Sequence, residues 1–174
     1  METLRIILLI VIPSALVFVT AYFSIKQFFT NEQKKRESEL FSNNQKITIP
    51  IKLQAYERLV LFLERINPQS LLVRIQNPHA TAGQLHNDLL IAVRAEFEHN
   101  LSQQMYVSPA SWLAVKRAKE VLIKIINEEA SKIAVNAPAS ALSEAILMRI
   151  VALTDNPIQV AIDTLKVEVT RFLS

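Results

Sequence analysis

The chain has 174 residues, of which 51% are hydrophobic, and it contains one glycine and no cysteine. The lack of cysteine excludes disulfides, thiolate zinc sites and cysteine nucleophiles. The scarcity of glycine argues against tight β-hairpins, which need positive φ angles, and favours helices. Residues 1–46 carry six Lys or Arg and four Glu, whereas the rest of the chain carries thirteen and twelve. The main part of the chain is therefore nearly neutral, and we expect no nucleic-acid partner.

The first long apolar stretch runs from Ile6 to Ile25 and holds no charged residue between Arg5 and Lys26. A helix rises about 1.5 Å per residue, so these residues match the roughly 30 Å of a bilayer core. They predict one transmembrane helix within an N-terminal anchor at residues 1–27. A cleaved signal peptide is the competing interpretation, because Val19-Thr20-Ala21 has the small-residue spacing of a cleavage site.

Residues 28–46 are polar and predict a juxtamembrane stalk. The flank after the apolar stretch carries Lys26, Lys34, Lys35 and Arg36, and the positive-inside rule places such a flank in the cytoplasm. We therefore expect a single-pass protein of the inner membrane whose C-terminal domain is cytoplasmic. The lipid bilayer is then one expected partner.

Residues 47–174 predict an all-α bundle of about six helices, divided by proline. Proline is favoured in the first helical turn, and an Asn or Ser before it can accept hydrogen bonds from unpaired backbone N–H groups. Four prolines follow such a residue, as in Ser108-Pro109 and Asn156-Pro157. The expected helices span 50–66, 68–76, 81–106, 109–134, 138–153 and 157–173, and Asn43-Asn44 is expected to break any helix that enters the stalk.

The pair Glu96 and His99 forms a Glu-x-x-His motif, which supplies part of the ligand set of di-iron helical bundles. The chain holds one copy, and such a site needs two copies and two further Glu residues. The pair is therefore a weak metal candidate, and we predict no resident metal or cofactor. The sole glycine excludes phosphate-binding glycine loops, and no nucleophile elbow is present.

The expected helix over 50–66 is apolar on more than one side. A broad stripe that includes Leu59 and Leu63 is expected to face the core, while Leu53 and Val60 lie on roughly the opposite side and Leu61 on one flank. Either another helix of the same domain or a partner protein covers this second side. If these residues are core, Val60→Lys should lower the melting temperature sharply. Trp112 is a further candidate anchor for a partner, and rim packing of the bundle is its alternative.

Two stretches carry a resemblance to a known family: LQAYERLVLFLERINPQSLLVRIQNP at Leu53–Pro78 and LHNDLLIAVRAEFEHNLSQQMYVS at Leu85–Ser108. They resemble an uncharacterised family of small single-pass membrane proteins of Bacteroidota. The resemblance covers most of residues 48–173 and implies an architecture without assigning an activity.

These observations predict a non-enzymatic, membrane-anchored helical adaptor or scaffold. It would hold other membrane or cytoplasmic proteins, or a second copy of itself, at the inner membrane. The alternative is a small metal- or ligand-binding helical protein that uses Glu96 and His99.

Overall fold

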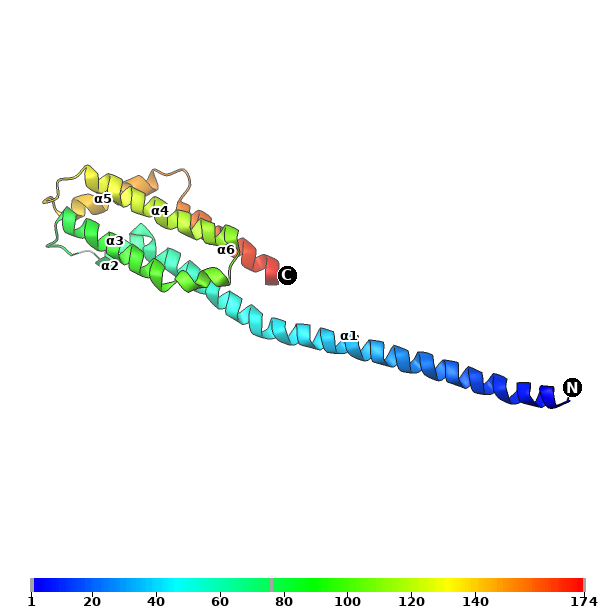
Figure 1. Cartoon of the computed structure of the whole chain (residues 1–174). Helices are drawn as coiled ribbons and strands as arrows, with labels where there is room; N and C mark the ends of the chain where they lie inside the picture. Colours follow the sequence, from blue (N-terminus) through cyan, green and yellow to red (C-terminus); the bar gives the residue numbers. More distant parts are fainter. Residues whose placement is uncertain (1, 76, 174) are drawn as a thin grey trace. The chain divides into compact units, whose positions relative to one another are not determined.

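The computed structural model describes residues 2–75 and 77–173, and the side chains at 3–5, 7–8, 10–15, 37–38, 40–45 and 172 lie outside that description. The described residues form helices and no strand, so the predicted all-α class is confirmed (Figure 1). The elements are α1 (Glu2–Ile66), α2 (Pro68–Ile75), α3 (Ala82–His99), the 3₁₀ helix η1 (Leu101–Met105), α4 (Pro109–Ser131), α5 (Ala139–Val151) and α6 (Pro157–Leu173). The chain divides into two compact units, Met1–Ile49 and Pro50–Ser174.

The predicted transmembrane helix is contradicted. Among the residues that the structure describes, no helix combines the length and the apolar character needed to cross a bilayer. Residues 6–25 do not form a helix of their own, because α1 continues through the charged residues after Lys26 and ends only at Ile66. Several side chains of the predicted segment, at 7–8 and 10–15, lie outside the description. The cytoplasmic orientation inferred from the same segment stays a prediction.

Two predicted helix boundaries are also wrong. The backbone of α1 is helical at Asn43-Asn44 and at Pro50, where a break and a new helix were expected. Proline is favoured in a first helical turn but is not confined to it, because its main cost inside a helix is one lost hydrogen bond and a local clash.

Helices α2, α3, α4 and α6 begin with side-chain caps, whereas α5 begins after Pro138 without one. Ser108 caps α4, with its Oγ accepting from Ser111 N at 3.1 Å and Pro109 in the first turn. The side chain of Asn156 accepts from Ile158 N at 3.0 Å at the start of α6. Helix α3 begins at Ala82, within one residue of the predicted start at residue 81, and Thr81 caps it through a reciprocal capping box with Gln84.

The second unit has one hydrophobic core, built from the last turns of α1 and from α2 to α6. Helix α4 contacts α3, α5 and α6, and it runs beside α3 in Figure 1. The largest fully buried side chains include Phe62, Leu63, Leu85, Leu122, Leu142 and Ile158. Every fully buried side-chain N or O atom among the described residues has a hydrogen-bond partner, as a stable interior requires.

The sole glycine lies where two loops meet. Ala82 N donates to Ala137 O at 2.7 Å, and Gly83 N donates to Val135 O at 3.0 Å. A Cβ atom at residue 83 would lie 2.5 Å from Cγ1 of Val135. The glycine therefore permits the close approach that ties the start of α3 to the segment before α5.

Candidate functional site

The second unit has an apolar groove between the last turns of α1 and helix α6. Its volume is about 650 Å³. Its apolar lining is Leu53, Val60, Leu61, Leu165 and Val169, and its polar lining is Tyr56, Glu57, Glu64, Lys166 and Thr170. A groove between two helices can receive the apolar stripe of a third helix.

The three α1 residues predicted to form a partner surface all line this groove. Leu61 is 56% exposed, whereas Leu53 and Val60 are half-buried and Val60 packs against the core. The floor includes Leu165, which is fully buried. The answer for Val60 lies between the two alternatives that the sequence left open, because Val60 packs against the core and also lines the groove.

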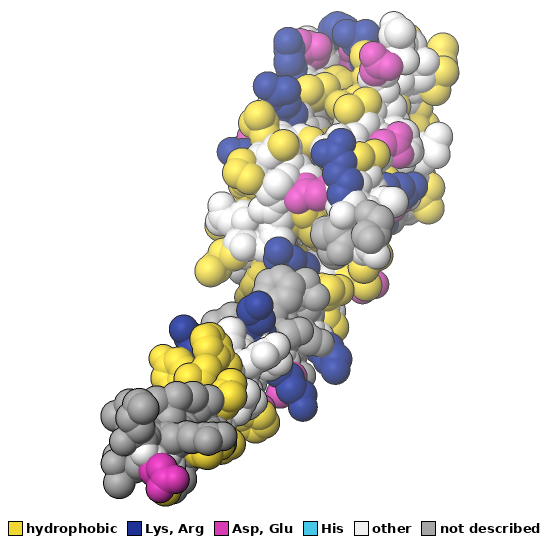
Figure 2. Space-filling model, turned by 90° about the vertical axis from the view of Figure 1, so that its right-hand side faces the viewer, with side chains coloured by type: hydrophobic (Ala, Val, Ile, Leu, Met, Phe, Trp, Pro, Cys, Tyr) yellow, Lys and Arg dark blue, Asp and Glu magenta, His cyan; other side chains and the backbone are white. Residues whose placement is uncertain are grey.

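The charges on the groove differ between its two walls. Glu57 and Glu64 lie seven residues apart on α1, so they point to one side of that helix two turns apart. Lys166 lies on the α6 wall. On the face of the molecule shown in Figure 2, basic, acidic and hydrophobic side chains are interspersed. Two acidic residues thus lie on the α1 wall of the groove and one basic residue on its α6 wall.

Trp112, the fourth predicted contact residue, lies in the rim of the core instead of the groove. Its ring stacks on Phe97 with centroids 5.5 Å apart and an interplanar angle of 21°. Phe97 also packs against Phe62 at 5.9 Å and lies under the ammonium group of Lys119 at 4.1 Å. Trp112 therefore joins α4 to α3 and is half-buried, which favours its alternative role in bundle packing.

A polar cluster holds α6, the second wall of the groove, in place. Glu168 of α6 accepts from Ser108 N at 3.1 Å and from Ser108 Oγ at 2.6 Å, and it accepts a further hydrogen bond from Ser111 Oγ. The hydroxyl of Tyr56 on α1 is also hydrogen-bonded to Glu168. The carboxylate thus lies at the N-terminus of α4, where the helix dipole favours negative charge, and it links three helices.

The two titratable groups of this cluster are shifted in opposite directions. Burial acts to raise the pKa of Glu168, but hydrogen bonds from Ser108, Ser111 and Tyr56 outweigh burial and hold that pKa below its ordinary value. Burial, reinforced by the Glu168 carboxylate, raises the pKa of Tyr56 well above its ordinary value. A general base needs a pKa near the working pH. Glu168 is shifted away from that range, so the cluster has the properties of a structural clamp.

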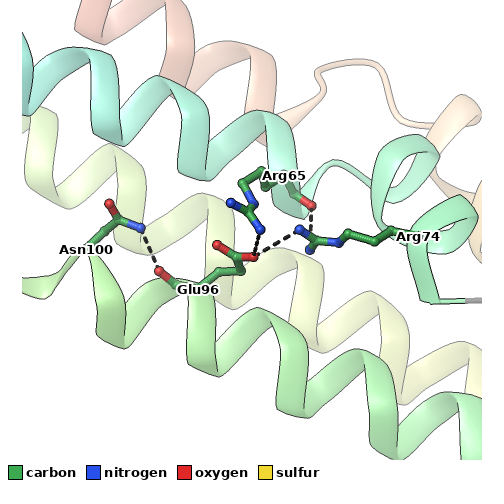
Figure 3. Close-up of polar contacts among 4 residues, drawn as sticks. All are labelled: Arg65, Arg74, Glu96 and Asn100. Carbon is green, nitrogen blue, oxygen red and sulfur yellow. Dashed lines mark hydrogen bonds and ion pairs between the residues drawn. The ribbon is translucent and has the colours of Figure 1, made fainter.

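The predicted metal candidate is occupied by arginine. Oε1 of Glu96 lies 2.9 Å from Nη2 of Arg65 and 3.0 Å from Nη1 of Arg74, as Figure 3 shows. His99, on the last turn of α3, is exposed. Among the described residues, no group of three or more His, Cys, Asp or Glu is arranged to hold a metal ion.

Sequence reasoning missed the Glu168 cluster and the two arginines on Glu96. Ser108 and Glu168 are 60 residues apart in the chain, and no local spacing connects them. The one available signal was the Ser108-Pro109 cap, which marks an N-terminus where a carboxylate is favourable but does not say which carboxylate lies there.

The described residues define a class: a small helical protein with an open apolar groove between two helices. Its sequence matches the family of unknown function DUF7935 over residues 2–172, and the chain belongs to that family. No curated protein and no solved structure matches the chain.

Proposed function

We propose that this protein is a non-enzymatic helical adaptor that binds an amphipathic helix of a partner protein in the groove between α1 and α6. The observation that supports the proposal is the groove itself, with Leu61 more than half exposed at its edge. Apolar side chains from both helices line it. In helix-in-groove recognition, a bound helix inserts apolar side chains spaced three or four residues apart into such a groove. The stretch from Leu53 to Glu64 is about 17 Å long, which corresponds to about three turns of a bound helix.

The charges on the walls support one kind of occupant. A bound helix that buries an apolar stripe would place its flanking residues against Glu57 and Glu64 on one side and Lys166 on the other. Complementary charges set the orientation and the association rate of such a complex. We therefore expect a partner helix with Lys or Arg beside its apolar stripe on the α1 side. We also propose that the chain's family belongs to Bacteroidota, as the resemblance of its sequence implies.

The alternative function, metal or ligand binding through Glu96 and His99, has less support. Glu96 gives one oxygen to two guanidinium groups. A metal ion would have to displace both ion pairs and would leave two arginines without their carboxylate, which is costly.

The occupant can be tested with two designed peptides and the full chain. Both peptides carry the same leucine stripe over about four turns, one flanked by lysine and the other by glutamate. We expect the lysine peptide to bind more tightly in a fluorescence anisotropy titration, because the α1 wall is acidic. Leu61→Lys should weaken that binding at least tenfold, since it places a charge at the apolar edge of the groove.

Val73→Lys is the matched control. Val73 lies on α2, is 79% exposed and does not line the groove, so this variant adds the same charge elsewhere. Equal binding by the two variants, or equal affinity for the two peptides, would contradict the proposal. A concentration-dependent dimer of the full chain that Leu61→Lys abolishes would show that a second copy is the occupant instead.

A further inference from the structure

A second recess lies where the last turns of α1 and α3 meet. It has a volume of about 260 Å³ and is lined by Arg58, Leu61, Phe62, Arg65, Glu96, His99 and Asn100. Its walls are therefore mainly polar and cationic, unlike those of the apolar groove. Leu61 lines both hollows, so the recess adjoins the groove while its chemistry differs.

Positive charge exceeds negative charge in this recess. Arg65 and Arg74 converge on one oxygen of Glu96 from α1 and α2 (Figure 3). Arg58 and Arg65 line the recess, whereas Arg74 reaches Glu96 from outside its lining. Arg58 makes no hydrogen bond or ion pair with any described residue. Three cationic side chains are thus matched by one carboxylate.

The nearby helix ends do not neutralise this excess. Helices α1 and α3 end at Ile66 and His99, and each C-terminus contributes roughly half a negative charge. Nη2 of Arg74 donates to the carbonyl of Arg65 at 3.3 Å, so part of the Arg74 guanidinium already pairs with the C-terminal end of α1. After both ends and Glu96 are counted, about one positive charge remains unmatched.

The donors in the recess suit an oxyanion with several acceptor oxygens. Arg58, the remaining N–H groups of Arg65 and the ring of His99 approach from two helices. A planar guanidinium donates two parallel hydrogen bonds to a phosphate or carboxylate. A phosphate monoester carries three terminal oxygens and nearly two negative charges, so it can accept from three separate donors. A carboxylate ligand would only repeat the ion pairing that Glu96 already provides.

We propose that this recess binds a phosphate group, with Arg58, Arg65 and His99 as its donors. The site goes beyond the proposed adaptor function, because it uses polar side chains that do not contact the groove, and its occupation does not require a helix in the groove. The shared ligand chemistry is a phosphate group, either free or carried by a phosphorylated side chain.

Isothermal titration of the full chain tests the proposal with three probes: inorganic phosphate, a short phosphoserine peptide and acetate. We expect at least one of the two phosphate probes to bind and acetate to bind more weakly. Tighter binding of inorganic phosphate would indicate a free anion as the natural ligand, and tighter binding of the peptide would indicate a phosphorylated partner. Absence of binding by both phosphate probes, or equal binding of acetate, would overturn the assignment.

Arg58→Gln is the decisive variant, because Arg58 has no partner among the described residues and its loss leaves the Glu96 ion pairs intact. Loss of one charge-assisted contact should weaken phosphate binding about tenfold. Arg149→Gln removes an exposed arginine on α5 and should leave the affinity unchanged. If both variants weaken binding equally, the attraction comes from net charge and the recess is not the site.

Discussion

Replacing Glu168 should destabilise the second unit and change how its stability depends on pH. The Glu168 carboxylate accepts hydrogen bonds from Ser108 and Ser111 at the start of α4 and is hydrogen-bonded to Tyr56 on α1. A hydrogen bond to a charged group contributes about 1.5–3 kcal/mol, but bonds to one carboxylate are not additive and water partly replaces them at a half-buried site. We therefore expect Glu168→Ala to cost about 3 kcal/mol, or roughly 10 °C in melting temperature for a unit of this size.

The sign of the pH effect follows from the lowered pKa of Glu168. A carboxyl group whose pKa is lower in the folded state stabilises the fold above its unfolded pKa, near 4.5, and loses this contribution as the pH falls through the folded value. The difference in free energy of unfolding between the wild type and Glu168→Gln should thus be largest near neutral pH and should shrink below about pH 4.5.

Urea unfolding followed by tryptophan emission provides the assay, because Trp112 is the only tryptophan and lies in this unit. Glu144→Gln is the control, since Glu144 is exposed on α5 and makes no contact of this kind with the described residues. A difference for Glu168→Gln that stays constant from pH 7 to pH 3, or a cost no larger than that of Glu144→Gln, would refute the reasoning.

Three further predictions follow from the same packing. Tyr56 should remain protonated when an ordinary tyrosine is half ionised, near pH 10, so an absorbance titration should show a late transition that Tyr56→Phe removes. The stability that neutral Tyr56 provides is present below about pH 10 and is lost as the pH rises through its raised pKa. Trp112→Ala should lower the free energy of unfolding by about 2–3 kcal/mol, because it removes the half-buried ring that stacks on Phe97. A cost below about 0.5 kcal/mol in denaturant unfolding would show that the stack is not part of the core. Val60→Lys should lower the free energy of unfolding by only about 1–2 kcal/mol in calorimetry, because a lysine can extend its ammonium group along the open groove to water. This cost is smaller than the sequence alone predicts. A larger loss of stability would show that Val60 is fully buried in the core.

The sequence predicted the starts of α4 and α6 because their signals are local. Ser108 with Pro109 and Asn156 with Pro157 act within one turn, so a reader of the sequence alone can place α4 and α6. The apolar side of α1 that borders the groove was visible for the same reason, as Leu53 and Val60 repeat with the period of a helix.

The sequence did not predict the role of Glu96 or the length of α1. The first depends on contacts between residues that are distant in the chain. Glu96 forms the expected motif with His99, but its role is set by Arg65 and Arg74, which reach it from two other helices. The apolar run after Arg5 predicted a membrane helix, but no helix of the described residues is long and apolar enough to cross a bilayer. In the structure that run is the beginning of α1, a single helix that ends at Ile66.

Photocrosslinking from the groove tests the adaptor proposal most directly. A p-benzoyl-phenylalanine placed at Leu61 in the full chain, and at Val73 as the control, should be irradiated in cells that make the protein naturally. The account predicts a crosslink from position 61, but not from position 73, to one partner segment that mass spectrometry identifies as an amphipathic helix with Lys or Arg beside its apolar stripe. Crosslinks from position 61 only to the same chain, or to the same set of proteins as from position 73, would contradict it.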